Sequence, residues 1–133
     1  MKNILTIGAL PTTVERRSLY RAMEILCRSY AEEVFTPIDT LDFQGTLAER
    51  YKRAFLKVGE ADLIIAEMSE RSDGAGMEIK DAEYKGKPVV VVARRGVKVS
   101  NLIMGCPAVR EKIDYESNSK LIKKLSGVLN SFK

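Results

Sequence analysis

The residue types best suited to chemistry lie in one stretch, residues 72–78, which reads SDGAGME. Gly74 and Gly76 allow a tight turn and let the backbone approach a ligand closely. The helix that follows offers free N–H groups and a positive dipole end, which stabilise an anion, and Ser72 could add a hydroxyl donor. We expect Glu78, in the first helical turn, to be ionised. A positioned carboxylate of this kind can attack an electrophilic sugar carbon or stabilise an oxocarbenium ion.

The same stretch also fits an ordinary connection between a strand and a helix. SDG is a common turn sequence, and a Glu in a first helical turn is common helix chemistry. The chain has no GxGxxG after its first apolar run and no Walker A sequence. It also has no histidine, which excludes Ser-His-Asp and Cys-His catalysis and the common His-containing zinc sites. Spacing alone therefore leaves both a ligand loop and a purely structural turn open.

Composition indicates a globular protein with one domain over residues 1–133. The hydrophobic share is 45% and the charged share 30%, and no apolar run approaches the length that crosses a bilayer. The first residues, MKNILTIGAL, contain too short an apolar run for a signal peptide, so we expect a cytoplasmic protein. Two cysteines are too few for a disulfide framework, and Cys27 is expected in the core.

Apolar runs alternate with segments of helical period along the chain. We expect strands at 4–8, 33–38, 61–68, 89–93 and 111–115. We expect helices at 12–33, at 46–59, from the SDGAGME stretch to about residue 85, and at 117–132. This alternation predicts an α/β fold with an open parallel sheet, whose ligands bind beyond the carboxyl ends of the strands. Those ends are at 8–13, 37–44, 67–76 and 94–100.

The first helix carries an apolar stripe and a basic face. The apolar positions at helical spacing are Val14, Leu19, Met23, Leu26 and Tyr30. The basic positions expected to face water are Arg16, Arg17, Arg21 and Arg28. With a formal net charge of +4, this face permits nucleic-acid binding without requiring it, and an ordinary solvated face explains it as well.

Residues 61–96 extend the pattern on both sides of the SDGAGME stretch. They combine AD before an apolar strand, AE at its end, a serine, GxGxE, and then GKP before another strand. This pattern resembles that of the nucleoside 2-deoxyribosyltransferases and, within that superfamily, of the 2′-deoxynucleoside 5′-phosphate N-hydrolases. The residues that fit it are Gly8, Ala61, Asp62, Ala66, Glu67, Ser72, Gly74, Gly76, Glu78, Gly86, Lys87 and Pro88.

The resemblance implies a flavodoxin-like three-layer sandwich with a five-stranded parallel sheet, usually a homodimer, that acts on the N-glycosidic bond of a nucleoside or nucleotide without a cofactor or metal. It places the nucleophile on Glu78 and contacts to the substrate phosphate on Ser72. In the hydrolases a serine after the fourth strand comes from the neighbouring subunit, which points to Ser100. An alternative for Ser100 is a helix N-cap before Asn101.

Two positions depart from the family pattern. The family usually has an aspartate eight residues before the Asp of its AD element, and here that position is Ala54. The nearest acid in that helix, Glu49, lies on a different face. The first strand also lacks the family's aromatic residue, which Tyr20 or Tyr51 could replace. Two functions therefore stay open: an N-glycosidase or transferase with Glu78 as nucleophile, and a catalytically impaired sensor that binds a nucleotide in the same pocket.

Overall fold

Five parallel strands form one sheet in the order β2-β1-β3-β4-β5. The computed structural model describes residues 1–132, so Lys133, the last residue of the expected domain, lies outside the described part. The strands are β1 (Asn3–Gly8), β2 (Glu33–Phe35), β3 (Leu63–Glu67), β4 (Val89–Arg94) and β5 (Val109–Tyr115). Every neighbouring pair is parallel. The fold class predicted from the sequence is confirmed.

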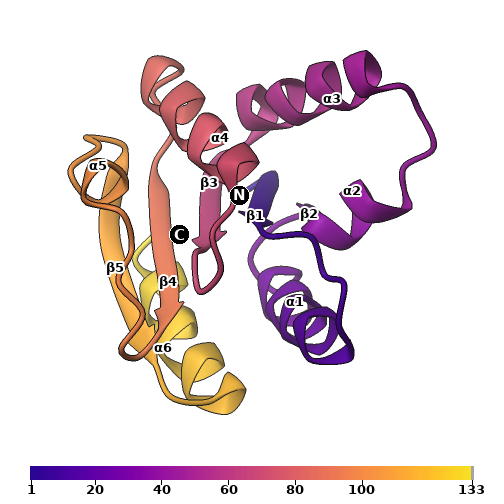
Figure 1. The fold of residues 1–133 in the computed structure, drawn as a ribbon. Coiled ribbons are helices and arrows are strands. Elements are labelled where there is room, and N and C mark those ends of the chain that lie inside the picture. The colour runs from indigo at the N-terminus through magenta and orange to yellow at the C-terminus, as the bar shows by residue number, and fades with distance from the viewer. Residues whose placement is uncertain (133) are drawn as a thin grey trace.

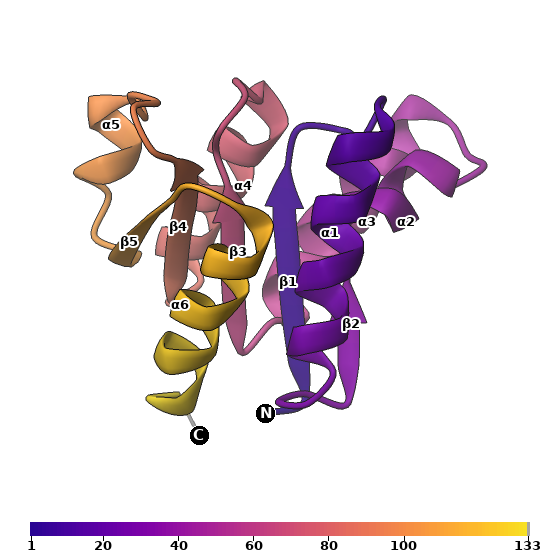
Figure 2. The same ribbon diagram turned by 90° about the horizontal axis from the view of Figure 1, so that it is seen from below.

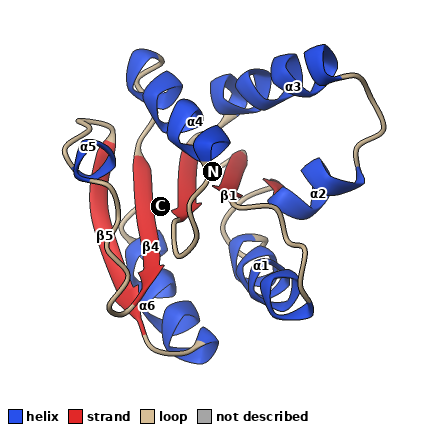
Figure 3. Ribbon diagram, viewed as in Figure 1, coloured by secondary structure: helices blue, strands red, loops and turns tan. Residues whose placement is uncertain are grey.

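Helices cover both faces of the sheet (Figure 1). They are α1 (Val14–Cys27), α2 (Pro37–Asp42), α3 (Leu47–Glu60), α4 (Asp73–Tyr84), α5 (Asn101–Met104) and α6 (Asn118–Asn130). Helices α1 and α6 pack on one face, as Figure 2 shows from that side, and α3 and α4 pack on the other. Figure 3 shows the resulting three layers, with the strands between two sets of helices.

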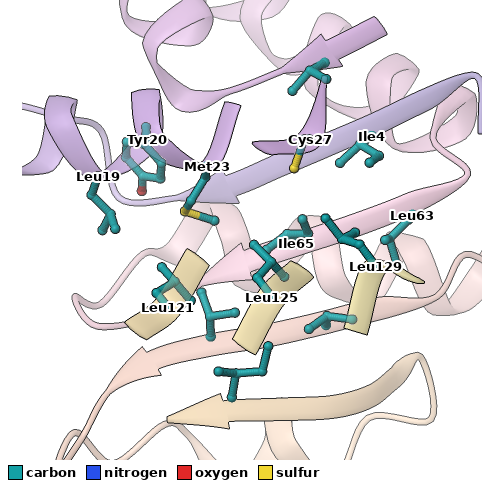
Figure 4. Packing of buried hydrophobic residues seen from close by; sticks show 14 of the residues in the cluster. Ile4, Leu19, Tyr20, Met23, Cys27, Leu63, Ile65, Leu121, Leu125 and Leu129 are labelled. Atoms are coloured by element: carbon teal, nitrogen blue, oxygen red, sulfur yellow. The ribbon is translucent and has the colours of Figure 1, made fainter. Parts of the chain in front are cut away.

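The core consists of two apolar layers, one on each face of the sheet. Strands β3 and β4 are buried on both faces, which is why they read as continuous apolar runs. Leu63 and Ile65 face α1 and α6, whereas Ile64 and Ala66 face α3 and α4. Figure 4 shows the first of these layers, where Met23 and Cys27 of α1 meet the leucines of α6. The expected core position of Cys27 is confirmed.

Helix α2 lies where the sequence predicted the end of a strand. Strand β2 stops at Phe35, and Thr36 caps a helix that begins at Pro37. The Thr36 hydroxyl accepts from the Ile38 N–H, and the Asp39 carboxylate accepts from the Thr36 N–H at 2.8 Å. Pro suits the first turn of a helix because it lacks an N–H that would have no partner there. The expected strand at 33–38 is therefore wrong in its second half.

Helix α1 turns Leu19 and Met23 to the core as predicted, but two positions in its first turn differ from the prediction. Val14 is 77% exposed, whereas Arg16 is only 8% exposed. Thr13 caps the helix by accepting from the Arg16 N–H. The Arg16 guanidinium then reaches the carboxylate of Glu67 at the end of β3, 2.8 Å away. A buried cation is stable only with such a partner, and the apolar-stripe argument did not include Glu67.

Candidate functional site

A cleft of about 410 Å³ opens beside the carboxyl ends of β1 and β2 and the start of α4. It brings together four of the residues predicted from the sequence: Gly8, Ser72, Gly74 and Glu78. Ala54 of α3 lines the same cleft, so the position of the missing aspartate does share a cavity with Glu78. The lining residues also used below are Phe35, Tyr51 and Phe55.

The residues at the start of α4 are helical rather than looped. Ser72 is the N-cap, and its Oγ accepts from the Ala75 N–H at 3.1 Å. Gly74 and Gly76 have no positive φ, so the tight turn expected from them is wrong. Because glycine has no side chain, both residues leave the backbone of this turn accessible. A Cβ on Gly76 would meet no atom within 4 Å, and a Cβ on Gly74 would meet only Glu78 Oε1, at 3.9 Å.

Glu78 is half-buried and lies in the second turn of α4, because the helix already begins at Asp73. No hydrogen bond or ion pair involves its carboxylate among residues 1–132. Burial, and after it the negative charge of Asp81, raises the pKa of Glu78 to about 7. The expectation of a fully ionised first-turn carboxylate is therefore wrong. At neutral pH both protonation states of Glu78 are well populated.

Aromatic side chains form the wall of the cleft opposite Glu78. Tyr51 and Phe55, one helical turn apart on α3, have ring centroids 4.6 Å apart. Phe35 at the end of β2 carries the Arg53 guanidinium 4.7 Å above its ring. Of the two tyrosines that the sequence offered in place of an aromatic on β1, Tyr51 lines the cleft, whereas Tyr20 points from α1 into the core. Sequence reasoning missed Phe35 and Phe55, although the spacing of Tyr51 and Phe55 placed them on one helix face.

A second hollow, of about 920 Å³, lies on the other side of the first turn of α4. Ser72 borders both cavities, whereas Gly76 and Ser100 line only the second. Ser100 occupies the N-cap position of α5, but its side chain makes no capping hydrogen bond. The cations Arg71 and Lys98 also line this hollow. It therefore combines serine hydroxyls with charges of both signs, because Glu70 and Asp73 line it as well.

The basic face predicted on α1 is largely neutralised. Arg21 and Arg28 both bind the Glu24 carboxylate, at 2.9 and 2.7 Å. Arg17 lies 3.6 Å from the Asp42 carboxylate. With Arg16 buried, the four arginines do not form a continuous basic surface.

Among residues 1–132, no group of three or more His, Cys, Asp and Glu side chains is arranged to hold a metal ion. In the same part of the chain, no helix combines the length and the hydropathy that a membrane-spanning helix needs.

Gly8 is held in a conformation that only glycine adopts easily. Its φ is +153°, and a Cβ would lie 2.5 Å from Tyr20 Oη and 2.6 Å from the Glu67 carbonyl oxygen. We expect Gly8→Ala to lower the free energy of unfolding by about 1–3 kcal/mol, measured by denaturant melts. Gly127→Ala is the matched control, because Gly127 lies in α6 with open space around it. That control should raise stability by about 0.4–1 kcal/mol, and equal losses in the two variants would contradict the close packing at Gly8.

No protein-family model matches the chain. One curated protein, named "Putative 2′-deoxynucleoside 5′-phosphate N-hydrolase 1", from Syntrophotalea carbinolica, is 36% identical over 73 residues. The match covers 53% of this chain and 51% of that protein, so the chain matches about half the length of this relative.

Solved structures share the whole fold. A CMP N-glycosidase from Clostridium botulinum superposes with a TM-score of 0.69 at 18% identity, over 93% of this chain and 98% of that one. A 2-deoxyribosyltransferase from Bacillus psychrosaccharolyticus gives 0.68 at 17% identity, over 96% and 95%. A 2-desoxiribosyltransferase from Leishmania mexicana gives 0.58 at 17%, over 83% of each chain.

The architecture is therefore that of the nucleoside 2-deoxyribosyltransferase fold. The sequence match over about half of the chain is to a protein named as a 2′-deoxynucleoside 5′-phosphate N-hydrolase. The resemblance predicted from residues 61–96 is confirmed.

Proposed function

We propose that this chain is a single-domain N-glycosidase or deoxyribosyltransferase that acts on a nucleoside or nucleoside 5′-monophosphate, with Glu78 as the nucleophile. The observation that carries the proposal is the placement of Glu78. Its carboxylate has no partner within residues 1–132 and lines a cleft whose opposite wall is aromatic. A nucleobase can stack on one of these rings, Tyr51 or Phe55, and this would bring the sugar toward Glu78.

In the proposed reaction, a Glu78 oxygen attacks the anomeric carbon of the sugar, and the bond between that carbon and the base nitrogen breaks. The electron pair of that bond stays on the base, which takes a proton from water because Ala54 cannot supply one. A water molecule, or the nitrogen of a second base in transfer, then attacks the same carbon, releases Glu78 as a carboxylate, and gives up its proton to the hydroxide left by the first protonation. This is the double displacement of retaining glycosidases.

A phosphate on the substrate would be held at the start of α4. The free N–H groups and the dipole of this helix favour an anion, and the Ser72 hydroxyl can still donate because its capping bond uses only its oxygen as acceptor. Arg71 and Lys98 add positive charge nearby. The names of two similar proteins, a 5′-phosphate N-hydrolase and a CMP N-glycosidase, support a nucleotide substrate. The proposal includes a cytoplasmic homodimer in which Ser100 also contacts the phosphate.

A second candidate is a sensor that binds a nucleotide without cleaving it. The observation in its favour is Ala54, which leaves the cleft without a second acid beside Glu78. A raised Glu78 pKa also lowers the fraction of the nucleophilic form at neutral pH.

One experiment separates the two candidates. Ribo- and deoxyribonucleosides and their 5′-monophosphates are screened for base release and for a rise in melting temperature. We expect base release whose kcat/KM increases with pH through a midpoint near the Glu78 pKa of about 7 and levels off above it, because only the deprotonated form of Glu78 attacks. A thermal shift without base release would establish the sensor instead. Neither effect with any compound would overturn both candidates.

A further inference from the structure

A buried carboxylate lies at the carboxyl end of the central strand β3, close to the cleft. Glu67, the last residue of β3, has no exposed surface. Its Oε1 accepts from Arg16 Nη1 at 2.8 Å and from the Ser69 N–H at 3.0 Å. Its Oε2 accepts from Ser69 Oγ and from Tyr115 Oη, both at 2.6 Å. Burial and the hydrogen bond to Glu67 raise the pKa of Tyr115 to about 12, so Tyr115 stays a donor at neutral pH.

The contacts of Glu67 reach both loops that lead into the cleft. On one side, Arg16 Nη2 contacts Tyr20 Oη at 2.7 Å, and Tyr20 Oη donates to the Ala9 carbonyl at 2.8 Å. Ala9 belongs to the loop between β1 and α1. On the other side, Ser69 belongs to the loop between β3 and α4, and its Oγ also accepts from the Arg94 N–H at 2.8 Å. One carboxylate is thus linked to two loops and to the end of β4.

Glu67 itself does not line the cleft. Its carboxylate reaches Gly8 through Arg16 and Tyr20, because Tyr20 Oη lies so near Gly8 that a Cβ there would be only 2.5 Å from it. It acts on Ser72 through the chain, because Ser69 is fixed by two hydrogen bonds three residues before this cap. Any shift of the Glu67 carboxylate would therefore move both the Gly8 side and the Ser72 side of the cleft.

A buried ion pair at this place is not required for the stability of the sheet. Well-packed apolar residues are often at least as stabilising as a buried pair, and the rest of β3, Leu63–Ala66, is apolar. The polar network instead fixes the positions of the groups it joins, since each hydrogen bond restrains its donor in distance and angle.

We propose that Glu67 is a positioning residue, which holds the loops 8–10 and 69–72 at the spacing that a nucleotide bound beside Glu78 requires. The inference rests on the proposed function for its ligand. The arrangement of the loops can nevertheless be measured without any substrate, so the two can fail separately.

The test uses the full chain and Glu67→Gln, which keeps the shape of the side chain but removes its charge. We expect the backbone amide signals of both loops to shift in a ¹H–¹⁵N spectrum without ligand. With substrate, we expect kcat to fall on the order of 10- to 100-fold, with a smaller change in KM, at a temperature well below the melting point. Leu129→Ala is the control: it removes a buried side chain of α6 far from both loops and should lower the melting temperature while leaving kcat and the loop signals unchanged.

Two further variants each remove the side-chain hydrogen bonds that connect Glu67 to one of the two loops. They test the proposal even if Glu67→Gln does not fold. Tyr20→Phe should shift the signals of residues 8–10 and spare those of 70–72. Ser69→Ala should do the reverse, and Ser69→Thr, which keeps the hydroxyl, should restore the signals of 70–72. Wild-type loop signals in Glu67→Gln, or shifts in the two single-link variants that do not follow this division, would overturn the proposal. A wild-type protein that releases no base refutes the proposed function alone, because the spectra still report on Glu67.

Discussion

Glu78→Gln is expected to reduce base release by a factor on the order of 10³ or more, because an amide oxygen cannot form the glycosyl ester. Binding should survive. The amide has nearly the same size as the carboxylic acid, and it carries no negative charge that burial and Asp81 would disfavour. The same nucleotide should therefore still raise the melting temperature of the variant. The measurements are release of the free base by chromatography and a thermal-shift titration on the same protein.

Glu83→Gln is the matched control for this variant. It makes the same substitution on the same helix, at a side chain that binds Lys80 at 2.7 Å and does not line the cleft. Its base release should equal that of the wild type. If Glu78→Gln released base at the wild-type rate, Glu78 would not be the nucleophile, whatever else the cleft binds.

Ala54→Asp is expected to increase base release on the order of 100-fold, because a general acid that protonates the departing base commonly contributes a factor of this size or more. Ala54 lines the cleft that also contains Glu78, so a carboxyl at this position shares the cavity with the nucleophile. The rate should also become bell-shaped with pH. It rises as Glu78 loses its proton and falls as the new acid loses its own. The charge of ionised Glu78 should in turn raise the pKa of the new Asp, since a like charge disfavours ionisation, and this keeps the acid protonated to higher pH.

Ala54→Asn is the control for the size of the new side chain. It fills the same space without a proton to donate and should stay at the wild-type rate or below it. If Ala54→Asp bound nucleotide with an undiminished thermal shift yet released base no faster than Ala54→Asn, position 54 would have no role in protonating the leaving group.

The fold could be predicted from the sequence because its signals are local. The apolar runs of β3 and β4 and the helical periods between them fix a parallel α/β sheet without any knowledge of contacts. Helix α2 was missed because its signal is a capping box rather than a periodic stripe, and six residues are too few to show a period. Thr36, Pro37 and Asp39 carried that signal, and it was interpreted as the end of a strand.

The site could be predicted in part. Features that depend on neighbouring residues in the sequence were predicted, and features that depend on residues far apart in the sequence were not. The spacing of Ser72, Gly74 and Glu78 was readable because one helix start carries all three. The pKa of Glu78 was not, because it depends on burial in the folded cleft. Arg16 was assigned to solvent because its partner, Glu67, is 51 residues away in the sequence. A buried charge is set by its partner in space, which a helical pattern cannot show.

The packing of α3 has a consequence for how the cleft admits a ligand. Val58 is its one fully buried residue, whereas α4 on the other side of the cleft buries Ala75, Ile79 and Ala82 against the sheet. Segments with few buried apolar contacts open by local unfolding at lower free energy than the elements at the core. The wall of the cleft that carries Glu78 is therefore packed more firmly than the wall that carries Tyr51 and Phe55. We expect local opening of α3 to admit a base while α4 keeps Glu78 in place.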